Sequence, residues 1–544
     1  MIKVKRVFKV NGKPFYPLGS EASNSSGYNE TSSETAFKAI KLMHGNTLEI
    51  PIYWDEVEPE EGVFNFASID SLIASARRYE VKLLLMWFAT WKNANMDYAP
   101  EWVKTNPQRF KRVLSRTGDF IWVLSSHCQA NLEADKRAFT ALCRHLKAKD
   151  STEQTVIGLT VQNESGIMGS DRDYGPAAQA AFDGSVPSQL VTAMKKNGKG
   201  PIYNQWQKTG GKESGNWTQL FGWEAGEFMT AWSIAKFIDN IAASGKAVYD
   251  IPMYVNVWLM EQNWWPIPGE SYPSGAAVSK MMDLYKWFTP HVDMISPDAH
   301  IAEADRYEAV CASYARPDNP FFMPETGAEG DSHAWNMFRS IADYNSIGEF
   351  FFGAERVITE DGQVRPEAQM IVDSVRCTAA VIPLLLKYQG TGKIHAVIQE
   401  DLSWTQLLDL DGYSGLIEFG ERTAQYPGKD WQHTSPGMHN RRKQTDTNRG
   451  RGLVIQAKPH EFYLVGANYR LLLRSEPSTA MMPARLAIAD YLPKLPGSYI
   501  VRVDEGHFNK DSEFIVDKRR NGDEIDPAVW VEPDVGVVRL LTCD

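Results

Sequence analysis

The first 390 or so residues of the chain alternate between short apolar runs and segments with helical periodicity. Each apolar run has the length of one buried strand, and each periodic segment places apolar side chains on one face of a helix. Apolar strands that alternate with helices indicate a parallel sheet that is covered by helices. The predicted strands are residues 15–20, 46–52, 81–87, 156–162, 253–258, 292–297, 320–324 and 348–352.

Eight such strand–helix units suit a closed (β/α)₈ TIM barrel over residues 1–390. A doubly wound open sheet is the alternative that the same alternation allows. The clearest helical patterns between the strands are residues 224–243, 278–288 and 366–386. The segment between Glu164 and Glu224 is too long for an ordinary loop and follows a strand, so we expect it to form a lid or pocket wall on the catalytic face.

The alternation of strand and helix patterns ends after about residue 390. Short alternating runs punctuated by turn residues predict that residues 391–544 form a smaller, antiparallel, sandwich-like β domain. The runs that carry this prediction are residues 395–399, 450–459, 460–474, 484–491, 497–505 and 537–541. The predicted fold class is therefore α/β, a barrel followed by an antiparallel β domain.

The composition excludes several classes of protein. The chain carries 57 Lys and Arg against 68 Asp and Glu, a formal net charge of −11, which argues against a nucleic-acid partner. Its most apolar stretch, residues 378–386, is too short to span a membrane, and the N-terminus lacks the apolar core of a signal peptide. We therefore expect a cytoplasmic protein as the sequence is written, or a periplasmic or secreted one if a leader has been removed.

The motifs of cofactor and metal enzymes do not occur in the sequence. It has no phosphate-binding glycine loop, no GxSxG nucleophile elbow and no HExxH zinc helix. The five Cys are scattered without CxxC spacing, so neither a disulfide framework nor a zinc site is predicted. We expect an enzyme that works with carboxylates and needs no cofactor or metal.

Two acidic residues stand out by position. Glu164 follows the fourth predicted strand and Glu325 follows the seventh. Residues at the carboxyl ends of barrel strands point into the mouth, where TIM-barrel active sites lie. A pair of carboxyl groups across such a mouth is what glycosidic bond cleavage requires. The alternative is that both are ordinary acidic residues that cap helices or pair with Arg.

Further candidates lie at other strand ends. The 17 Trp suggest aromatic faces for sugar rings, although many Trp of any chain simply fill the core. Tyr53 and Trp54, Trp87 and Trp91, and then Trp258, Trp264 and Trp265 follow the second, third and fifth strands. The predicted substrate-binding residues on this basis are Tyr53, Trp87, Trp258, Glu21, Asn24 and Asp298.

The sequence also resembles a known group of enzymes. Residues 161–166, VQNESG, resemble the Asn-Glu acid/base motif of clan A glycoside hydrolases, whose barrels carry catalytic Glu on strands four and seven. Residues 51–66, PIYWDEVEPEEGVFNF, are similar to the second-strand signature of the family 35 and family 42 β-galactosidases. Residues 19–26 and 296–298 resemble a bacterial branch of family 35 with a C-terminal β-rich domain, so the resemblance covers nearly the whole chain.

The resemblance implies roles for particular residues. Glu164 matches the general acid/base, Glu325 the nucleophile, and Asn163 the residue that hydrogen-bonds the sugar 2-OH. The sequence departs from the family at Gln162, where Glu is usual, at Ser165, where Tyr is common, and at His300, where the branch tends to have Tyr. His300 is therefore a further predicted substrate-binding position, and these departures bear on sugar specificity more than on reaction type.

Together these observations predict a retaining exo-glycoside hydrolase that acts on the non-reducing ends of oligosaccharides, with a β-galactosidase as the first choice. One alternative is a clan A glycosidase for another β-linked sugar. Another is a carbohydrate-binding barrel that has lost catalysis. The expected partner is an oligosaccharide or glycoside, and a homo-oligomer is left open.

Overall fold

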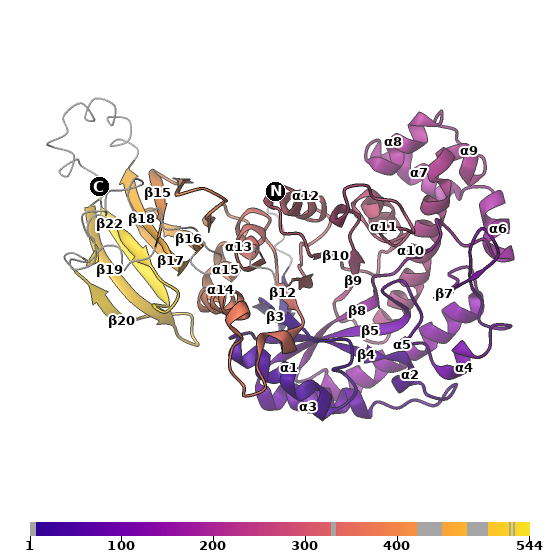
Figure 1. Cartoon of the computed structure of the whole chain (residues 1–544), viewed down its shortest axis with the longest axis horizontal. Helices are drawn as coiled ribbons and strands as arrows, with labels where there is room; N and C mark the ends of the chain where they lie inside the picture. The colour runs from indigo at the N-terminus through magenta and orange to yellow at the C-terminus, as the bar shows by residue number, and fades with distance from the viewer. Residues whose placement is uncertain are drawn as a thin grey trace.

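The computed structural model describes residues 7–327, 333–420, 449–475, 499–521, 524–525 and 528–543. Figure 1 shows a barrel enclosed by helices at one end of the molecule and antiparallel sheets at the other, with helices α13, α14 and α15 between them.

Eight parallel strands form the barrel sheet, in the order β11-β10-β9-β8-β5-β4-β3-β12. The ends of this order approach each other, since Met323, just before β11, forms a parallel bridge with Glu349 of β12. The sheet therefore closes, which confirms the predicted (β/α)₈ barrel over the open doubly wound sheet. The strands are β3 (Leu18–Glu21), β4 (Thr47–Tyr53), β5 (Lys82–Lys92), β8 (Val156–Asn163), β9 (Met253–Trp258), β10 (Met294–Ala299), β11 (Glu325–Thr326) and β12 (Glu349–Phe352).

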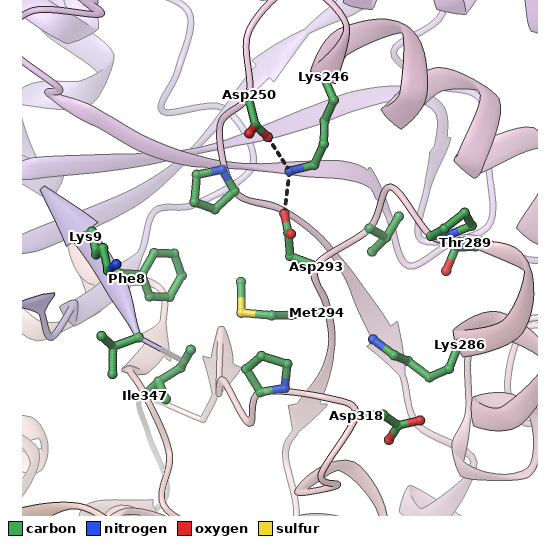
Figure 2. Close-up of a pocket in the computed structure, with 15 residues that line it drawn as sticks. Phe8, Lys9, Lys246, Asp250, Lys286, Thr289, Asp293, Met294, Asp318 and Ile347 are labelled. Carbon is green, nitrogen blue, oxygen red and sulfur yellow. Dashed lines mark hydrogen bonds and ion pairs between the residues drawn. The ribbon is translucent and has the colours of Figure 1, made fainter. Parts of the chain in front are cut away.

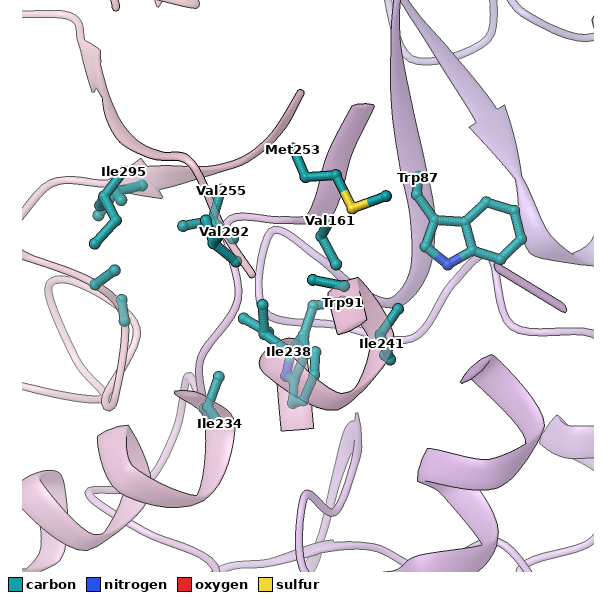
Figure 3. Close-up of a cluster of buried hydrophobic side chains, with 14 of the residues drawn as sticks. Trp87, Trp91, Val161, Ile234, Ile238, Ile241, Met253, Val255, Val292 and Ile295 are labelled. Carbon is teal, nitrogen blue, oxygen red and sulfur yellow. The ribbon is translucent and has the colours of Figure 1, made fainter. Parts of the chain in front are cut away.

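Helices cover the outside of this sheet. Their apolar faces pack on outward-pointing strand residues and form the largest hydrophobic core of the protein. In Figure 3, Val161, Met253 and Val255 of the strands face Ile238 and Ile241 of α10. The covering helices are α1 (Glu30–Leu42), α3 (Ala67–Tyr79), α5 (Gln129–Asp150), α10 (Ala225–Lys246), α11 (Met282–Phe288), α12 (Ala304–Tyr314), α13 (His333–Asp343) and α14 (Gln369–Ala380).

The long segment before α10 contains four short helices. They are α6 (Pro176–Asp183), α7 (Ser188–Asn197), α8 (Pro201–Lys208) and α9 (Trp217–Phe221). Their buried side chains, among them Leu190, Ile202 and Trp217, join the main core. The segment is thus a packed addition to the barrel, and its predicted part in a lid or pocket wall stays a prediction.

Two predicted elements are interrupted by proline. The predicted helix 366–386 is split into α14 and α15 (Ile382–Tyr388), because Pro383 lacks a backbone N–H and starts a new helix. The predicted strand 320–324 pairs only through a bridge at Met323, since Pro324 cannot donate to the ladder and regular pairing begins at Glu325. Among the described helices none is by itself long and apolar enough to cross a membrane; residues 366–380 and 382–388 meet that test only as a bent pair.

The C-terminal part consists of two antiparallel sheets, ordered β13-β16-β17-β22-β19-β20 and β14-β15-β18-β21. A separate apolar core with Ile417, Val454, Leu464 and Val538 lies between them. The strands are β13 (Ile394–Ile398), β14 (Thr405–Leu410), β15 (Tyr413–Phe419), β16 (Arg451–Lys458), β17 (Glu461–Ala467), β18 (Tyr469–Ser475), β19 (Tyr499–Phe508), β20 (Phe514–Arg520), β21 (Val529–Val531) and β22 (Val537–Cys543).

This arrangement confirms the predicted antiparallel β domain. The predicted run 460–474 is divided into β17 and β18, because Asn468 adopts a left-handed conformation with φ of 55° and turns the chain. The predicted run 484–491 lies outside the described residues.

The barrel and the β domain share a hydrophobic core. Side chains of α13, α14 and α15 pack on the face of the sheet of β13, β16 and β17 that points away from the second sheet. The buried guanidinium of Arg451 on β16 donates from Nε to Ser374 Oγ of α14 at 2.9 Å. The boundary at residue 390 stays a prediction, and the packing on either side of it is continuous.

We therefore predict that a chain ending at residue 390 does not fold into a stable barrel. Removing the β domain would expose Val375, Leu385 and their apolar neighbours to water, which costs roughly 25 cal/mol per Å² of apolar surface. The full chain should unfold in one calorimetric transition, and the shortened chain should be insoluble or bind a hydrophobic dye. Two well-separated transitions, or a soluble and cooperative barrel alone, would show that the shared core is dispensable.

Candidate active site

Glu164 and Glu325 lie in the same buried cluster at the carboxyl ends of the barrel strands. Glu164 directly follows β8, and Glu325 opens β11. The charge of Glu325 raises the pKa of Glu164, so the two carboxyl groups are close enough to affect each other's ionisation. The structure thus brings together the two residues that sequence position singled out.

The backbone around Glu164 is strained. Gln162 and Glu164 both have positive φ, of 71° and 44°, a region that residues other than glycine seldom adopt. The Gln162 side chain points away from the mouth and toward α5. Its Nε2 donates to Asp135 Oδ2 of that helix at 2.6 Å. Strain of this kind gathers at functional sites, where the surrounding contacts hold it. Here it turns Gln162 outward and leaves Asn163 and Glu164 at the mouth, so the bearing of Gln162 on sugar specificity is not through a direct contact with the sugar.

Glu164 has the ionisation expected of a general acid. Burial raises the pKa of its carboxyl group to about 7, and the charge of Glu325 adds to this effect. Lys92 opposes the shift. A carboxylic acid with this pKa still holds its proton in a large fraction of molecules near neutral pH.

Glu325 has the opposite tendency. Burial alone would raise its pKa, but a hydrogen bond from His300 and the charges of His300 and Lys92 bring the pKa below the ordinary value. His300 Nε2 lies 2.8 Å from Glu325 Oε1. The pKa of His300 is itself raised, because the contact with Glu325 outweighs the effect of burial. These opposite pKa shifts favour an ionised Glu325 carboxylate beside a protonated His300 ring.

Asp298 and Asn256 connect the two catalytic candidates. Asn256, on β9, donates from Nδ2 to Asp298 Oδ2 at 2.9 Å, and its Oδ1 accepts from the backbone N–H of Glu164 at 3.3 Å. Asp298 pairs in register with Glu325 on the next strand. Burial and the neighbouring carboxylates Glu325 and Glu164 raise the pKa of Asp298 well above its ordinary value. Asp298 therefore lies at the site, as predicted, and Asn256 positions it.

Glu21 and Glu49 extend the acidic cluster toward β3 and β4. Burial and the charge of Glu325 raise the pKa of Glu21 well above its usual range. Burial raises the pKa of Glu49 to about 8, and its carboxyl group accepts a short hydrogen bond from Tyr254. Glu21 is thus placed at the site as predicted, and Glu49 lies inside the barrel beside it.

Lys92, like Asn256, lies at the site but was missed by sequence reasoning. Its buried ammonium lies over the Phe88 ring, 4.7 Å from the centroid, and its charge acts on Glu21, Glu164 and Glu325. It ends β5, where a bulge places four residues between the pairs Trp87–Val161 and Lys92–Asn163. A lysine soon after an apolar strand was the available signal, but the predicted strand stopped at Trp87, five residues short of it.

Asn163 offers an unused donor and acceptor. Its side chain is buried, and neither Oδ1 nor Nδ2 has a hydrogen-bond partner within the described part of the chain. Buried polar groups are normally paired, so these two atoms are suited to hold a ligand hydroxyl group. The structure thus agrees with the position predicted for Asn163 and leaves its role to experiment.

The prediction that Trp87 lines the mouth is wrong. The Trp87 ring lies between β5 and α5, where Nε1 donates to Asp135 Oδ1 at 2.8 Å and the ring packs 6.0 Å from Phe139 (Figure 3). Trp91 also points outward and meets Phe237 of α10. Direct succession to an apolar strand did not reveal which face of the sheet each ring occupies.

Tyr53 also has a different role from the one predicted. Its ring is buried between Tyr28 and Tyr98, and its hydroxyl donates to the Asn24 carbonyl at 2.7 Å and accepts from Gly27 N at 2.9 Å. Tyr53 thus fixes the loop after β3. The Asn24 side chain is exposed and makes no hydrogen bond within the described residues, so its predicted substrate contact stays a prediction.

Trp258 ends β9 and is half-buried. It pairs in register with Asp298 of the neighbouring strand. This places it beside the acidic cluster, and its contact with a sugar stays a prediction.

A cavity of about 730 Å³ lies at the opposite face of the barrel (Figure 2). Its lining includes Phe8 of β1 (Phe8–Val10), Met294 at the start of β10 and residues near the carboxyl ends of α10 and α11. Lys246 in its wall is paired with Asp250 and Asp293. Within the described residues no group of three or more His, Cys, Asp or Glu side chains is arranged to hold a metal ion.

Comparison with known families adds an independent observation. Residues 24–208 match the glycoside hydrolase family 42 model, described as "Beta-galactosidase". This match lies within the barrel and covers less than half of the chain. It confirms the resemblance to the family 42 β-galactosidases that the second-strand signature indicated. Residues 376–532 match a domain of unknown function, DUF5597, which covers most of the β domain.

Solved structures similar to this chain include the catalytic domain of a β-amylase from Paenibacillus polymyxa, with 11% identity, a TM-score of 0.49 and coverage of 67% of this chain and 98% of that one. A β-galactosidase from Halorubrum lacusprofundi has 14% identity, a TM-score of 0.47 and coverage of 67% and 58%. A β-galactosidase from a Rahnella species has 14% identity, a TM-score of 0.49 and coverage of 71% and 58%. The chain thus spans less than two thirds of these galactosidases. No curated protein matches the chain.

Lys92 should set the pH range of activity. Replacing Lys92 with Met removes a cation that lowers the pKa of both Glu164 and Glu325. The basic limb of the kcat/KM profile, where Glu164 loses its proton near pH 7, and the acidic limb, where Glu325 gains one, should both move to higher pH. Lys92→Arg, which keeps the charge, is the matched control. Identical profiles for Lys92→Met and the original enzyme would show that Lys92 does not act on the pair.

Trp87→Phe tests the outward position of that ring. The substitution removes the donor to the buried Asp135 carboxylate, so the free energy of unfolding should fall by about 1–3 kcal/mol. Because the ring is remote from the mouth, KM should remain that of the original enzyme. An increased KM with unchanged thermal unfolding would instead show that Trp87 contacts the substrate.

Proposed function

We propose that this protein is a retaining exo-glycoside hydrolase and that its substrate is a β-galactoside. The observation that carries the proposal is the opposite ionisation of two carboxyl groups in one buried cluster. The pKa of Glu164 is raised to about 7 and that of Glu325 is lowered. A two-step displacement needs such a pair, with one acid that holds its proton and one carboxylate that is free to attack.

In the first step of the proposed reaction, a Glu325 oxygen attacks the anomeric carbon. The bond from that carbon to the glycosidic oxygen breaks, and Glu164 gives its proton to the departing oxygen. The sugar is then held as an ester of Glu325. Asn163, whose amide has no other partner in the described residues, is placed to hydrogen-bond the sugar as its ring flattens.

In the second step the roles of Glu164 reverse. Its carboxylate takes a proton from water while the water oxygen attacks the anomeric carbon. The ester bond breaks, Glu325 leaves as a carboxylate, and the sugar is released with its original configuration. His300 and Lys92 favour the ionised form of Glu325, so they stabilise both the attacking group and the leaving group.

The identity of the sugar rests on the family 42 match and the second-strand signature. His300 is the observation that favours an alternative sugar, because it stands where the related branch tends to have Tyr and contacts Glu325 directly. An imidazolium differs from a phenol in charge and reach. A clan A glycosidase for another β-linked sugar is therefore the second candidate.

A panel of nitrophenyl glycosides separates these candidates. We expect hydrolysis of the β-galactoside, and NMR of the first product should show the β-anomer. Hydrolysis of another β-glycoside alone would move the assignment to that sugar, and first release of the α-anomer would exclude retention.

Variants of the two carboxylates test their roles. Glu325→Gln should abolish turnover while it preserves sugar binding, and azide should rescue Glu325→Gly with an inverted glycosyl azide as product. Glu164→Gln should lower kcat by roughly 10²–10⁴-fold for substrates with poor leaving groups. An unchanged rate for Glu325→Gln would refute the nucleophile, and sugar binding with no turnover by the original protein would favour a non-catalytic barrel.

A further inference from the structure

Two adjacent tryptophans stand in solvent on the loop after β9. Trp264 and Trp265 are 75% and 84% exposed, among the most exposed large apolar side chains of the described residues. Two exposed indole rings that are neighbours in the sequence leave a large apolar area in water. Exposed apolar areas of this kind mark sites where a protein binds a partner or a ligand. The loop follows the carboxyl end of a barrel strand, the side on which the acidic cluster lies.

Hydrogen bonds fasten this loop to the acidic cluster. Gln262, two residues before Trp264, donates from Nε2 to the backbone carbonyl of Asp298 at 3.0 Å. Farther along, the Gly269 carbonyl accepts from Gly169 N at 2.6 Å, and Ser274 forms an antiparallel bridge with Ile167. The loop thus joins the strand end of Asp298 to the segment that follows Glu164, so it borders the mouth of the barrel.

Other contacts within the loop fix its shape. Asn263 donates from Nδ2 to the Ser271 carbonyl at 2.9 Å, and the Ser271 hydroxyl accepts from Ile267 N at 2.7 Å. The guanidinium of Arg306 on α12 lies 4.6 Å from the Trp264 ring centroid and covers one face of that ring. Arg306 also donates to the Glu261 carbonyl. Arg306 therefore holds the Trp264 ring on one face, and the other face of the ring is open to solvent.

We propose that Trp264 and Trp265 bind the leaving-group side of an oligosaccharide substrate, so that the preferred substrates are chains of two or more sugar residues beyond the scissile bond. This inference rests on the proposed function. An exo-acting enzyme buries the terminal sugar among the carboxylates, so only the leaving group extends outward past Asp298 to the loop. The apolar faces of pyranose rings pack on exposed aromatic rings. Because the loop is already fixed by hydrogen bonds, little ordering cost opposes binding.

The test compares substrates of increasing length. The probes are methyl β-galactoside and β-linked galactosyl oligosaccharides of two to four residues. With the original enzyme kcat/KM should rise with length. In Trp264→Ala/Trp265→Ala we expect this rise to disappear, with a loss of about tenfold or more for the longest substrate. Trp223→Ala is the matched control, since Trp223 is 82% exposed but lies on η1 (Gly222–Glu224), outside the loop.

A binding measurement separates this inference from the proposed reaction. Calorimetric titration of Glu325→Gln with the tetrasaccharide should show weaker binding when both tryptophans are replaced and unchanged binding for Trp223→Ala. If no galactoside is hydrolysed but this difference in binding holds, the reaction is wrong and the binding surface stands. Equal length dependence and equal binding with and without the two rings would overturn the inference. So would a change in subunit number caused by their replacement, which would assign the surface to contact between copies of the chain.

Discussion

The arrangement of the barrel mouth depends on the burial of several carboxyl groups in one cluster. Like charges placed together in a poorly solvated site cannot all ionise, so some must hold protons and the others must have cations nearby. The structure does both: the pKa values of Glu21 and Asp298 are raised, while Lys92 and His300 keep Glu325 ionised. The separation into an acid and a base that catalysis requires is thus a consequence of packing these groups together.

Burying such a cluster costs folding free energy, so the residues around it must be held rigidly. Outside the barrel, apolar side chains of the strands and of α10 form a dense core that fixes the strands. At the mouth, the positive φ values of Gln162 and Glu164 are held by contacts on both sides. Gln162 is anchored to Asp135 outside the barrel, and the Glu164 N–H is bound by Asn256 within it. The strain persists because both neighbours are fixed.

The sequence predicted the barrel, the β domain and the common location of Glu164 and Glu325 because each depends on local patterns. Strand and helix periods revealed the fold, and strand-end position revealed Glu164 and Glu325. The features that the sequence did not predict depend on tertiary structure. The bulge in β5 carries Lys92 to the site from beyond the predicted strand end, and no periodic pattern marks a bulge. Trp87 was misplaced because position in the sequence does not show on which face of a fully buried strand a side chain lies.

The reaction is easier to infer than the substrate, because the carboxylates lie on strands and the candidate substrate contacts lie on loops. The carboxylates lie at strand ends, whose positions follow from hydrogen-bonded register, as for Asp298 beside Glu325. We propose that selectivity depends on His300, directly after β10, and on the loop that carries Trp264, because loops can vary without disturbing the sheet. This loop is tied to Asp298 through Gln262, so we expect a change in its length or anchoring to alter which substrates bind before it alters the reaction. On this proposal a few contacts at the mouth determine specificity, whereas the sheet determines reactivity.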